Sequence, residues 1–186
     1  RTLSLTSRRM RILREVKDSV LWLIEDNPCA VINLRREAET RGVDASRLIF
    51  APRVDVAEHL ARHRLADLFI DTWPYNAHTT AADALWAGLP VLTKTGTAFA
   101  ARVAASLLTA IDLPELITHT VQDYEALAIK LARDRSALKQ IREVLSVNRL
   151  TKPLFDTSRF ARHLETAYQI MLDRHEAGFP PDHIDL

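Results

Sequence analysis

The stretch between residues 74 and 90 holds most of the side chains in this sequence that could bind a ligand. Amide, imidazole, hydroxyl and carboxylate groups follow one another closely there, at Asn76, His78, Thr79, Thr80 and Asp83. If a helix begins at the threonine pair, its first backbone N–H groups and the positive end of its dipole lie beside the two hydroxyls. Such an arrangement can bind a phosphate group.

The same residues also have a purely structural interpretation. Thr79 or Thr80 suits the N-cap position of a helix, and Thr80-x-x-Asp83 fits a capping box, in which the two side chains bond the free N–H groups of the first turn. Spacing alone favours this structural interpretation over a ligand site.

The glycine content limits the kinds of nucleotide site that the chain could form. It has only four glycines, and it contains neither G-x-G-x-x-G nor G-x-x-x-x-G-K-[ST]. These motifs mark dinucleotide-binding dehydrogenases and P-loop kinases or ATPases, so both classes are disfavoured. A nucleotide held by hydroxyls and helix N-termini instead points to enzymes that use nucleotide sugars.

A second group of basic side chains follows the apolar run that ends at Pro52. It consists of His59, Arg62, His63 and Arg64, on a predicted helix. His59 and His63 share a helix face, but no third ligand lies nearby in the sequence, so no metal site is expected. The two arginines suit a solvated surface better than a ligand, although a pyrophosphate beside the strand ends would also suit them.

The elements that would position these side chains alternate along the chain. Compact apolar runs predict strands over 19–25, 47–52, 67–71 and 89–94, and amphipathic segments predict helices over 8–16, 30–41, 56–63, 80–87 and 98–108. This alternation predicts an α/β fold with a Rossmann-like, doubly wound parallel sheet. Ligands bind outside the carboxyl ends of such strands, where the polar stretches fall. Gly96 would allow a tight turn before another helix N-terminus there, although a plain loop is slightly favoured.

The last third of the chain has a helical pattern. Apolar residues recur at helical spacing over 121–149 and 158–176, and Pro153 lies between the two segments. We therefore expect extra C-terminal helices. The chain divides into a nucleotide-sugar-binding Rossmann-like lobe, residues 1–150, and a C-terminal helix with an irregular tail, residues 151–186.

Composition narrows the partners and the setting. The 186 residues carry a formal net charge of +1, which argues against a nucleic-acid surface. No apolar run approaches the ~18 residues of a membrane span, and the first residues suit a helix start better than a signal peptide. Cys29 is the only cysteine, so no internal disulfide is expected. These features predict a cytoplasmic protein without nucleic-acid or membrane partners.

Several long runs of residues resemble one known family. "ADLFIDTWPYNAHTTAADALWAGLPVLT", followed by "FAARVAASLL", is similar to the C-terminal catalytic lobe of the O-GlcNAc transferase/SPINDLY family. "LIFAPRVDVAEHLARHRLAD" and "KPLFDTSRFARHLETAYQIM" match the same family in order and spacing. The resemblance implies a GT-B fold, an inverting glycosyltransferase, UDP-GlcNAc as the donor, and Ser or Thr of a protein as the acceptor.

The resemblance also implies roles for individual residues. His59 would contact the uracil with Arg62 beside it, and Asp83 would accept hydrogen bonds from the ribose. His78, Thr79 and Thr80 would hold the diphosphate. Thr79 and Thr80 would be catalytic, because donors aimed at the departing diphosphate stabilise its developing charge. No metal cofactor is expected for such a site.

The sequence departs from the family pattern in ways that leave alternatives open. The family's "P-G-E-T" appears as residues 95–98, Val56 replaces a lysine, and the strand that carries a phosphate-contacting lysine is absent before Arg1. The N-terminal lobe and the tetratricopeptide repeats are missing too, so the chain is expected to be a fragment with half an active site. The alternatives are a UDP-glucose or GDP-fucose donor, and a nucleotide-binding or interaction module without turnover. A homodimer through an exposed sheet edge is a further expectation.

Overall fold

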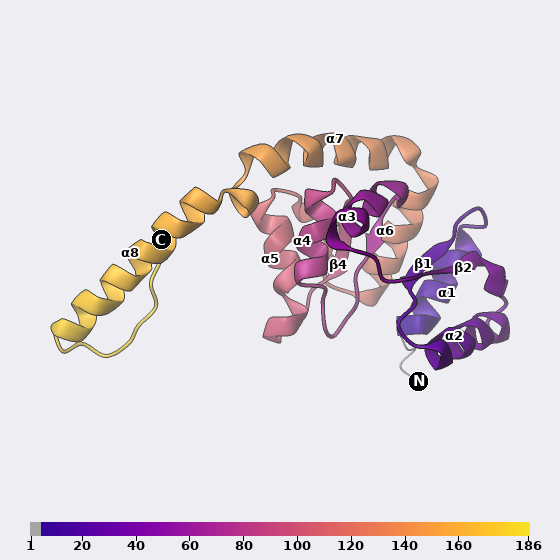
Figure 1. Ribbon diagram of the computed structural model, residues 1–186, viewed down its shortest axis with the longest axis horizontal. Helices are drawn as coiled ribbons and strands as arrows, with labels where there is room; N and C mark the ends of the chain where they lie inside the picture. The colour runs from indigo at the N-terminus through magenta and orange to yellow at the C-terminus, as the bar shows by residue number, and fades with distance from the viewer. Residues whose placement is uncertain (1–4) are drawn as a thin grey trace.

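The computed structural model describes the backbone of residues 5–186 and the side chains of residues 8–186, and it is an α/β fold (Figure 1). Its strands are β1 Leu21–Ile24, β2 Leu48–Ala51, β3 Phe69–Ile70, β4 Val91–Lys94 and β5 Ile117–Thr118. Its helices are α1 Leu5–Glu15, α2 Pro28–Thr40, α3 Val56–Arg62, α4 Thr79–Trp86, α5 Val103–Ala110, α6 Val121–Arg133, α7 Arg135–Thr151 and α8 Thr157–Glu176. The predicted α/β class with parallel strands is confirmed, and β5 is a strand that the sequence pattern does not predict.

The strands form two hydrogen-bonded pieces. β1 pairs with β2, β4 lies between β3 and β5, and all these pairs are parallel. In the usual doubly wound order, 3-2-1-4-5-6, β2 and β1 would take the first two places and β3, β4 and β5 the last three. No strand among residues 5–186 fills the place between β1 and β3, so the two pieces are not hydrogen-bonded to each other.

Helix α1 packs against both pieces of the sheet. Met10 and Leu13 are buried in a cluster with Leu48 of β2, whereas Ile12 is buried in a different cluster with Leu92 of β4. Leu and Ile side chains on neighbouring faces of one helix can do this because successive helical residues are rotated by about a quarter turn. Helix α1 therefore joins the two halves through the core.

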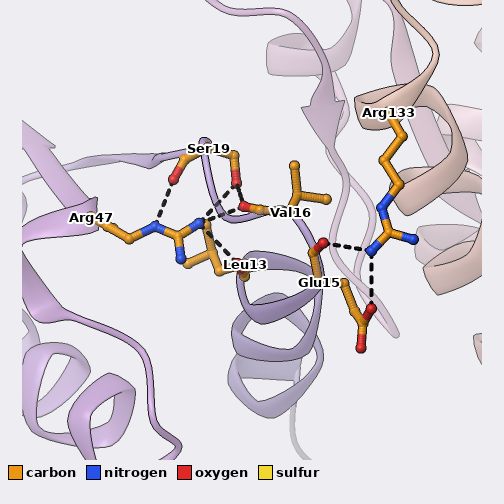
Figure 2. A network of polar contacts seen from close by, with 6 residues as sticks. All are labelled: Leu13, Glu15, Val16, Ser19, Arg47 and Arg133. Atoms are coloured by element: carbon orange, nitrogen blue, oxygen red, sulfur yellow. Dashed lines mark hydrogen bonds and ion pairs between the residues drawn. The ribbon is translucent and has the colours of Figure 1, made fainter.

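The carboxyl end of α1 is held by arginines from other elements (Figure 2). Arg47, just before β2, donates to the carbonyl oxygens of Leu13 and Val16 at 2.8 and 2.7 Å. Arg133 of α6 donates to the carbonyl oxygen of Glu15 at 2.6 Å and also pairs with its carboxylate. These cations satisfy carbonyl groups that have no partner within a helix end, and they interact favourably with the helix dipole.

Helix α4 is positioned by its apolar face. Ala81, Ala84 and Leu85 are fully buried and pack in one cluster with Val91 of β4 and with residues of α5 and α7. Their spacing of three and four places them on one side of the helix. Thr79 and Thr80, in the first turn of α4, are exposed to solvent.

Helix α8 leads away from the body of the molecule (Figure 1). None of its residues is buried, and its apolar side chains, such as Phe160 and Tyr168, are exposed. The division at residue 150 and the homodimer through a sheet edge stay predictions. In the part of the chain that the structure describes, no helix is both long and apolar enough to cross a membrane.

The contacts of Arg47 lead to a stability prediction. Arg47→Met should lower the free energy of unfolding by about 2 kcal/mol, because it removes charged hydrogen bonds to carbonyl groups at the end of α1. Arg53→Met is the matched control, since Arg53 pairs only with the carboxylate of Asp26 and both side chains are exposed. Its effect should stay within about 0.5 kcal/mol. Urea unfolding of the two variants measures the difference, and equal effects would contradict the role assigned to Arg47.

Candidate functional site

A buried carboxylate holds the loop that follows β3. Asp71 has no exposed surface, and its Oδ1 accepts hydrogen bonds from the backbone N–H groups of Thr72 and Ala77, both at 2.7 Å. Its Oδ2 accepts from the hydroxyl of Thr93 on β4 at 2.6 Å. Burial raises the pKa of Asp71, while these hydrogen bonds and the nearby charge of Arg9 oppose that shift.

Asn76 holds the same loop from within. Its backbone N–H donates to the carbonyl of Ala100 at 2.8 Å, and its side-chain Nδ2 donates to the carbonyl of Thr72 at 2.7 Å. Asn76 is 1% exposed, and within the described residues its Oδ1 accepts no hydrogen bond. The loop thus reaches α4 in a conformation set by backbone contacts on both sides.

Helix α4 begins at Thr79, and the predicted capping is wrong. The N-cap residue is His78, not Thr79 or Thr80, and its side chain makes no capping bond. No hydrogen bond joins Thr80 to Asp83, because the loop held by Asp71 and Asn76 places both threonines inside the first turn. In the described part of the chain, the backbone N–H groups of Thr79 and Thr80 have no acceptor.

Five other helices contrast with α4 in this respect, whereas α5 also has no side-chain cap. Side chains cap α2, α3, α6, α7 and α8, at Asn27, Asp55, Thr120, Asp134 and Asp156. A side-chain cap contributes about 1 kcal/mol to a helix. Helix α4 lacks that contribution, and its first N–H groups stay accessible beside two exposed hydroxyls.

The imidazole of His78 lies between two aromatic rings. Tyr75 stacks on it with ring centroids 4.9 Å apart, and Phe99 approaches it edge-on at 6.1 Å. Both aromatic rings are themselves largely exposed. The Nε2 atom of His78 is buried and has no partner among the described residues, so it is a polar group that a ligand could satisfy.

Helix α3 brings the second predicted group to the same region. Arg62 donates to the carbonyl of Pro52 at 2.9 Å and to Nδ1 of His59 at 2.8 Å. Arginine has no acceptor, so His59 must be neutral with its proton on Nε2. Burial, followed by the positive charges of His63 and Arg62, lowers the pKa of His59, whereas the carboxylate of Asp83 on α4 acts in the opposite direction. Asp83 therefore lies close enough to His59 to influence its pKa.

His63 and Gly96 have packing roles in the structure and are not part of the candidate ligand-binding site. His63 is 8% exposed and its Nδ1 contacts the carbonyl of His59, so it serves the packing of α3. After Gly96, the predicted helix start at Ala98 is wrong: a short 3-10 helix, Phe99–Ala101, comes first and α5 begins at Val103. A Cβ on Gly96 would lie 2.8 Å from that of Ala101, which explains the glycine by close packing.

Neither Asp71 nor the ring pair of Tyr75 and Phe99 is among the site residues predicted from the sequence. An aspartate at the end of an apolar run is a usable signal, because a buried carboxylate needs several donors nearby. The ring pair carries no comparable signal, since Phe99 is distant in sequence from His78. Within the described residues there is no group of three or more His, Cys, Asp or Glu side chains that could hold a metal ion.

Comparison with known proteins gives a consistent result. The family model described as glycosyl transferase family 41 matches residues 3–164. A UDP-N-acetylglucosamine--peptide N-acetylglucosaminyltransferase of Caenorhabditis elegans is 36% identical over 175 residues, which are 94% of this chain and 15% of that protein. A probable enzyme of the same name from Arabidopsis thaliana is 38% identical over 92% of this chain and 18% of its own length.

A solved structure agrees with these relatives. A mutant of the Thermobaculum terrenum O-GlcNAc transferase superposes with a TM-score of 0.85 and 33% sequence identity, over 90% of this chain and 33% of that chain. This chain spans less than a fifth of the two curated relatives and a third of the solved chain. The match to the family model covers most of the sequence, and the chain belongs to glycosyl transferase family 41.

Proposed function

We propose that this chain is the donor-binding lobe of an inverting O-GlcNAc transferase-like glycosyltransferase that uses UDP-GlcNAc and acts on Ser or Thr of proteins. The start of α4, with the uncapped N–H groups of Thr79 and Thr80 beside the unpartnered Nε2 of His78, is the observation that carries the proposal. Membership of glycosyl transferase family 41 supports it.

The start of α4 would hold the diphosphate of the donor. The uncapped backbone N–H groups and exposed hydroxyls of Thr79 and Thr80 would donate to it, and His78 would add a ring nitrogen. When the sugar leaves, negative charge grows on the diphosphate, and fixed donors stabilise that charge without having to reorganise. These side chains would supply the stabilisation without a metal ion, which is why none is proposed.

The nucleoside would lie toward α3. A neutral His59 with a proton on Nε2 offers a donor to a uracil carbonyl, while Arg62 fixes the ring through Nδ1. Asp83 would accept hydrogen bonds from the ribose hydroxyls, a role that keeps its charge away from the diphosphate. The carboxylate of Asp83 lies near enough to His59 to influence its pKa, which supports one continuous site for both parts of the nucleotide.

A second candidate is a nucleotide-binding or interaction module without turnover. The place between β1 and β3 that no described strand fills favours it for these 186 residues alone. A strand there would end at the point where the strand order reverses, beside the proposed ligand. The protein acceptor and the catalytic step would then need residues beyond this lobe.

Titration calorimetry with four ligands tests the donor. The chain should bind UDP and UDP-GlcNAc, and bind them more tightly than GDP, because His59 and Arg62 face the base. Equal or tighter binding of UDP-glucose would replace UDP-GlcNAc as the donor, and tighter binding of GDP would favour a GDP-fucose enzyme. If none of the four binds at millimolar concentration, the proposed donor site is wrong.

The threonine pair provides a direct test of the diphosphate role. Replacing both Thr79 and Thr80 by Ala should weaken UDP binding about 10- to 100-fold, since a hydrogen bond to a charged group contributes about 1.5–3 kcal/mol. The matched control replaces Thr109 and Thr166, exposed helical threonines whose hydroxyls bond carbonyls of their own helices. The control should bind UDP like the unchanged chain. An unchanged dissociation constant for the Thr79/Thr80 variant would remove the hydroxyls from the site.

The state of His59 leads to a pH prediction. Its pKa is lower in the folded chain than in the unfolded chain, so the unfolded chain binds the proton more tightly. Stability should therefore fall as the pH drops from the ordinary histidine value of about 6.5 toward the lowered one. His59→Gln should remove part of this fall between pH 7.5 and pH 5 in urea unfolding, whereas His119→Gln, at an exposed position, should leave it unchanged. Identical profiles for the two variants would show that His59 is not held neutral by burial.

A further inference from the structure

Asp71 is a buried charged group to which the proposed function gives no task. It is fully buried at the end of β3, behind the loop that leads to α4, so it cannot touch a donor bound at Thr79 and Thr80. A buried carboxylate is costly unless several donors surround it. Asp71 has three such donors, namely the backbone N–H groups of Thr72 and Ala77 and the hydroxyl of Thr93.

The hydrogen bonds of Asp71 join the two ends of one loop. A single oxygen, Oδ1, accepts from the N–H of Thr72, the first residue of the loop, and of Ala77, the last residue before His78. The other oxygen, Oδ2, is oriented by the hydroxyl of Thr93. Both ends of the loop are therefore bonded to the same carboxylate oxygen. Ala77 cannot move without breaking its hydrogen bond to Asp71.

The carboxylate itself is attached to rigid parts of the fold. The N–H of Asp71 donates to the carbonyl of Leu92 on β4 at 3.0 Å, and its carbonyl accepts from the buried hydroxyl of Tyr124 on α6 at 2.8 Å. Thr93 is fixed in turn, since its carbonyl accepts from the hydroxyl of Thr118 on β5 at 2.8 Å. Strands β3, β4 and β5 and helix α6 thus determine where Oδ1 lies.

The position of Ala77 sets the direction of the first N–H groups of α4. His78 follows it as the N-cap, with φ −106° and ψ −95°, outside the usual extended conformation of N-cap residues. No side chain caps the helix, so the bond of Ala77 to Asp71 holds the residue before His78, while the carbonyl of His78 accepts from the N–H groups of Ala81 and Ala82, both at 3.1 Å. A displacement of about 1 Å at such a point is enough to misalign donors with a bound group.

We propose that Asp71 is a positioning residue for the diphosphate site, which it holds through Ala77 without touching the ligand. This role rests on the proposed function, because it concerns the aim of the N–H groups and hydroxyls at Thr79 and Thr80. An alternative is that Asp71 only stabilises the fold. The two differ in a measurable way, since a positioning residue affects the diphosphate part of the ligand and spares the nucleoside part.

The experiment compares UDP with uridine on four forms of the 186-residue chain. The variants are Asp71→Ala, which removes the acceptor, Asp71→Asn, whose Oδ1 can still accept both N–H groups, and Asp67→Asn. Asp67 is the control, an exposed aspartate just before the same strand. Calorimetry gives the dissociation constants, and amide hydrogen exchange gives the protection of Ala77 in the absence of ligand.

The expected result is selective. Asp71→Ala should weaken UDP at least about tenfold, or 1.4 kcal/mol, while uridine changes less than about twofold, and Ala77 should lose its exchange protection. Asp71→Asn should restore UDP binding to within about threefold of the unchanged chain, together with the protection of Ala77. Asp67→Asn should match the unchanged chain in every measurement.

Other outcomes separate the positioning role from the proposed function. If the unchanged chain binds neither UDP nor uridine, the proposed function fails and the positioning role fails with it. If it binds UDP and Asp71→Ala binds UDP equally well, or loses UDP and uridine to the same extent, only the positioning role is overturned. If Asp71→Ala does not fold, Thr93→Val replaces it, since it removes one donor to Asp71 and keeps a similar shape in the core. That variant should weaken UDP more than uridine, and equal weakening would overturn the role.

Discussion

The packing of α1 against both halves of the sheet is the interaction on which the rest of this structure depends. The two pieces, β1–β2 and β3–β4–β5, share no hydrogen bond. Met10 and Leu13 are buried with the first piece and Ile12 with the second, so adjacent residues of one helix belong to different parts of the core. Arg47 and Arg133 hold the end of this helix from the two sides (Figure 2).

Charge pairs fix α1 along its length as well. Arg8 and Arg11 both pair with Glu125 of α6, which is almost fully buried, at 2.9 and 2.7 Å. Removing one partner of a buried pair is strongly destabilising, whereas the pair itself contributes little net stability. These contacts therefore specify how α1 sits on α6, and the apolar contacts of Met10, Ile12 and Leu13 supply the free energy.

The geometry of the candidate site also depends on α1. Helix α3 follows β2 and helix α4 follows β3, so His59 and Asp83 come from different halves of the sheet. Asp83 can influence the pKa of His59 only because the halves are held in a fixed relation. Any movement of the first piece relative to the second would separate the proposed uracil contacts from the proposed ribose and diphosphate contacts.

Much of the fold follows from periodicity. The apolar runs that contain β1 to β4 are long enough to stand out between helices, and the alternation predicts parallel strands. β5 is too short for such a signal, because Ile117 and Thr118 lie directly after a 3-10 helix that contributes the buried Leu116. The division of the sheet is also invisible in the sequence, since it depends on which strands meet in space.

The sequence indicates the residue types of the candidate site better than its geometry. The polar stretch at the end of β3 and the basic residues of α3 stand out because strand ends collect ligands in parallel sheets. The capping box was a reasonable expectation from Thr80 and Asp83, yet the N-cap in the structure is His78, two residues before Thr80. That outcome depends on the contacts of Ala77 with Asp71 and of Asn76 with Ala100, and both residue pairs are joined by folding rather than by sequence spacing.

The uncapped start of α4 and the buried carboxylate of Asp71 act together: one leaves N–H groups accessible, and the other fixes the approach to the helix. A side-chain cap would stabilise the helix, but it would also occupy an N–H group that an anion could use. Asp71 fixes the approach to the helix through the N–H of Ala77, one residue before the N-cap, and leaves the N–H groups of Thr79 and Thr80 accessible. Because its own charge is surrounded by three donors and lies below the loop, the carboxylate can hold this geometry with little repulsion of a phosphate above it.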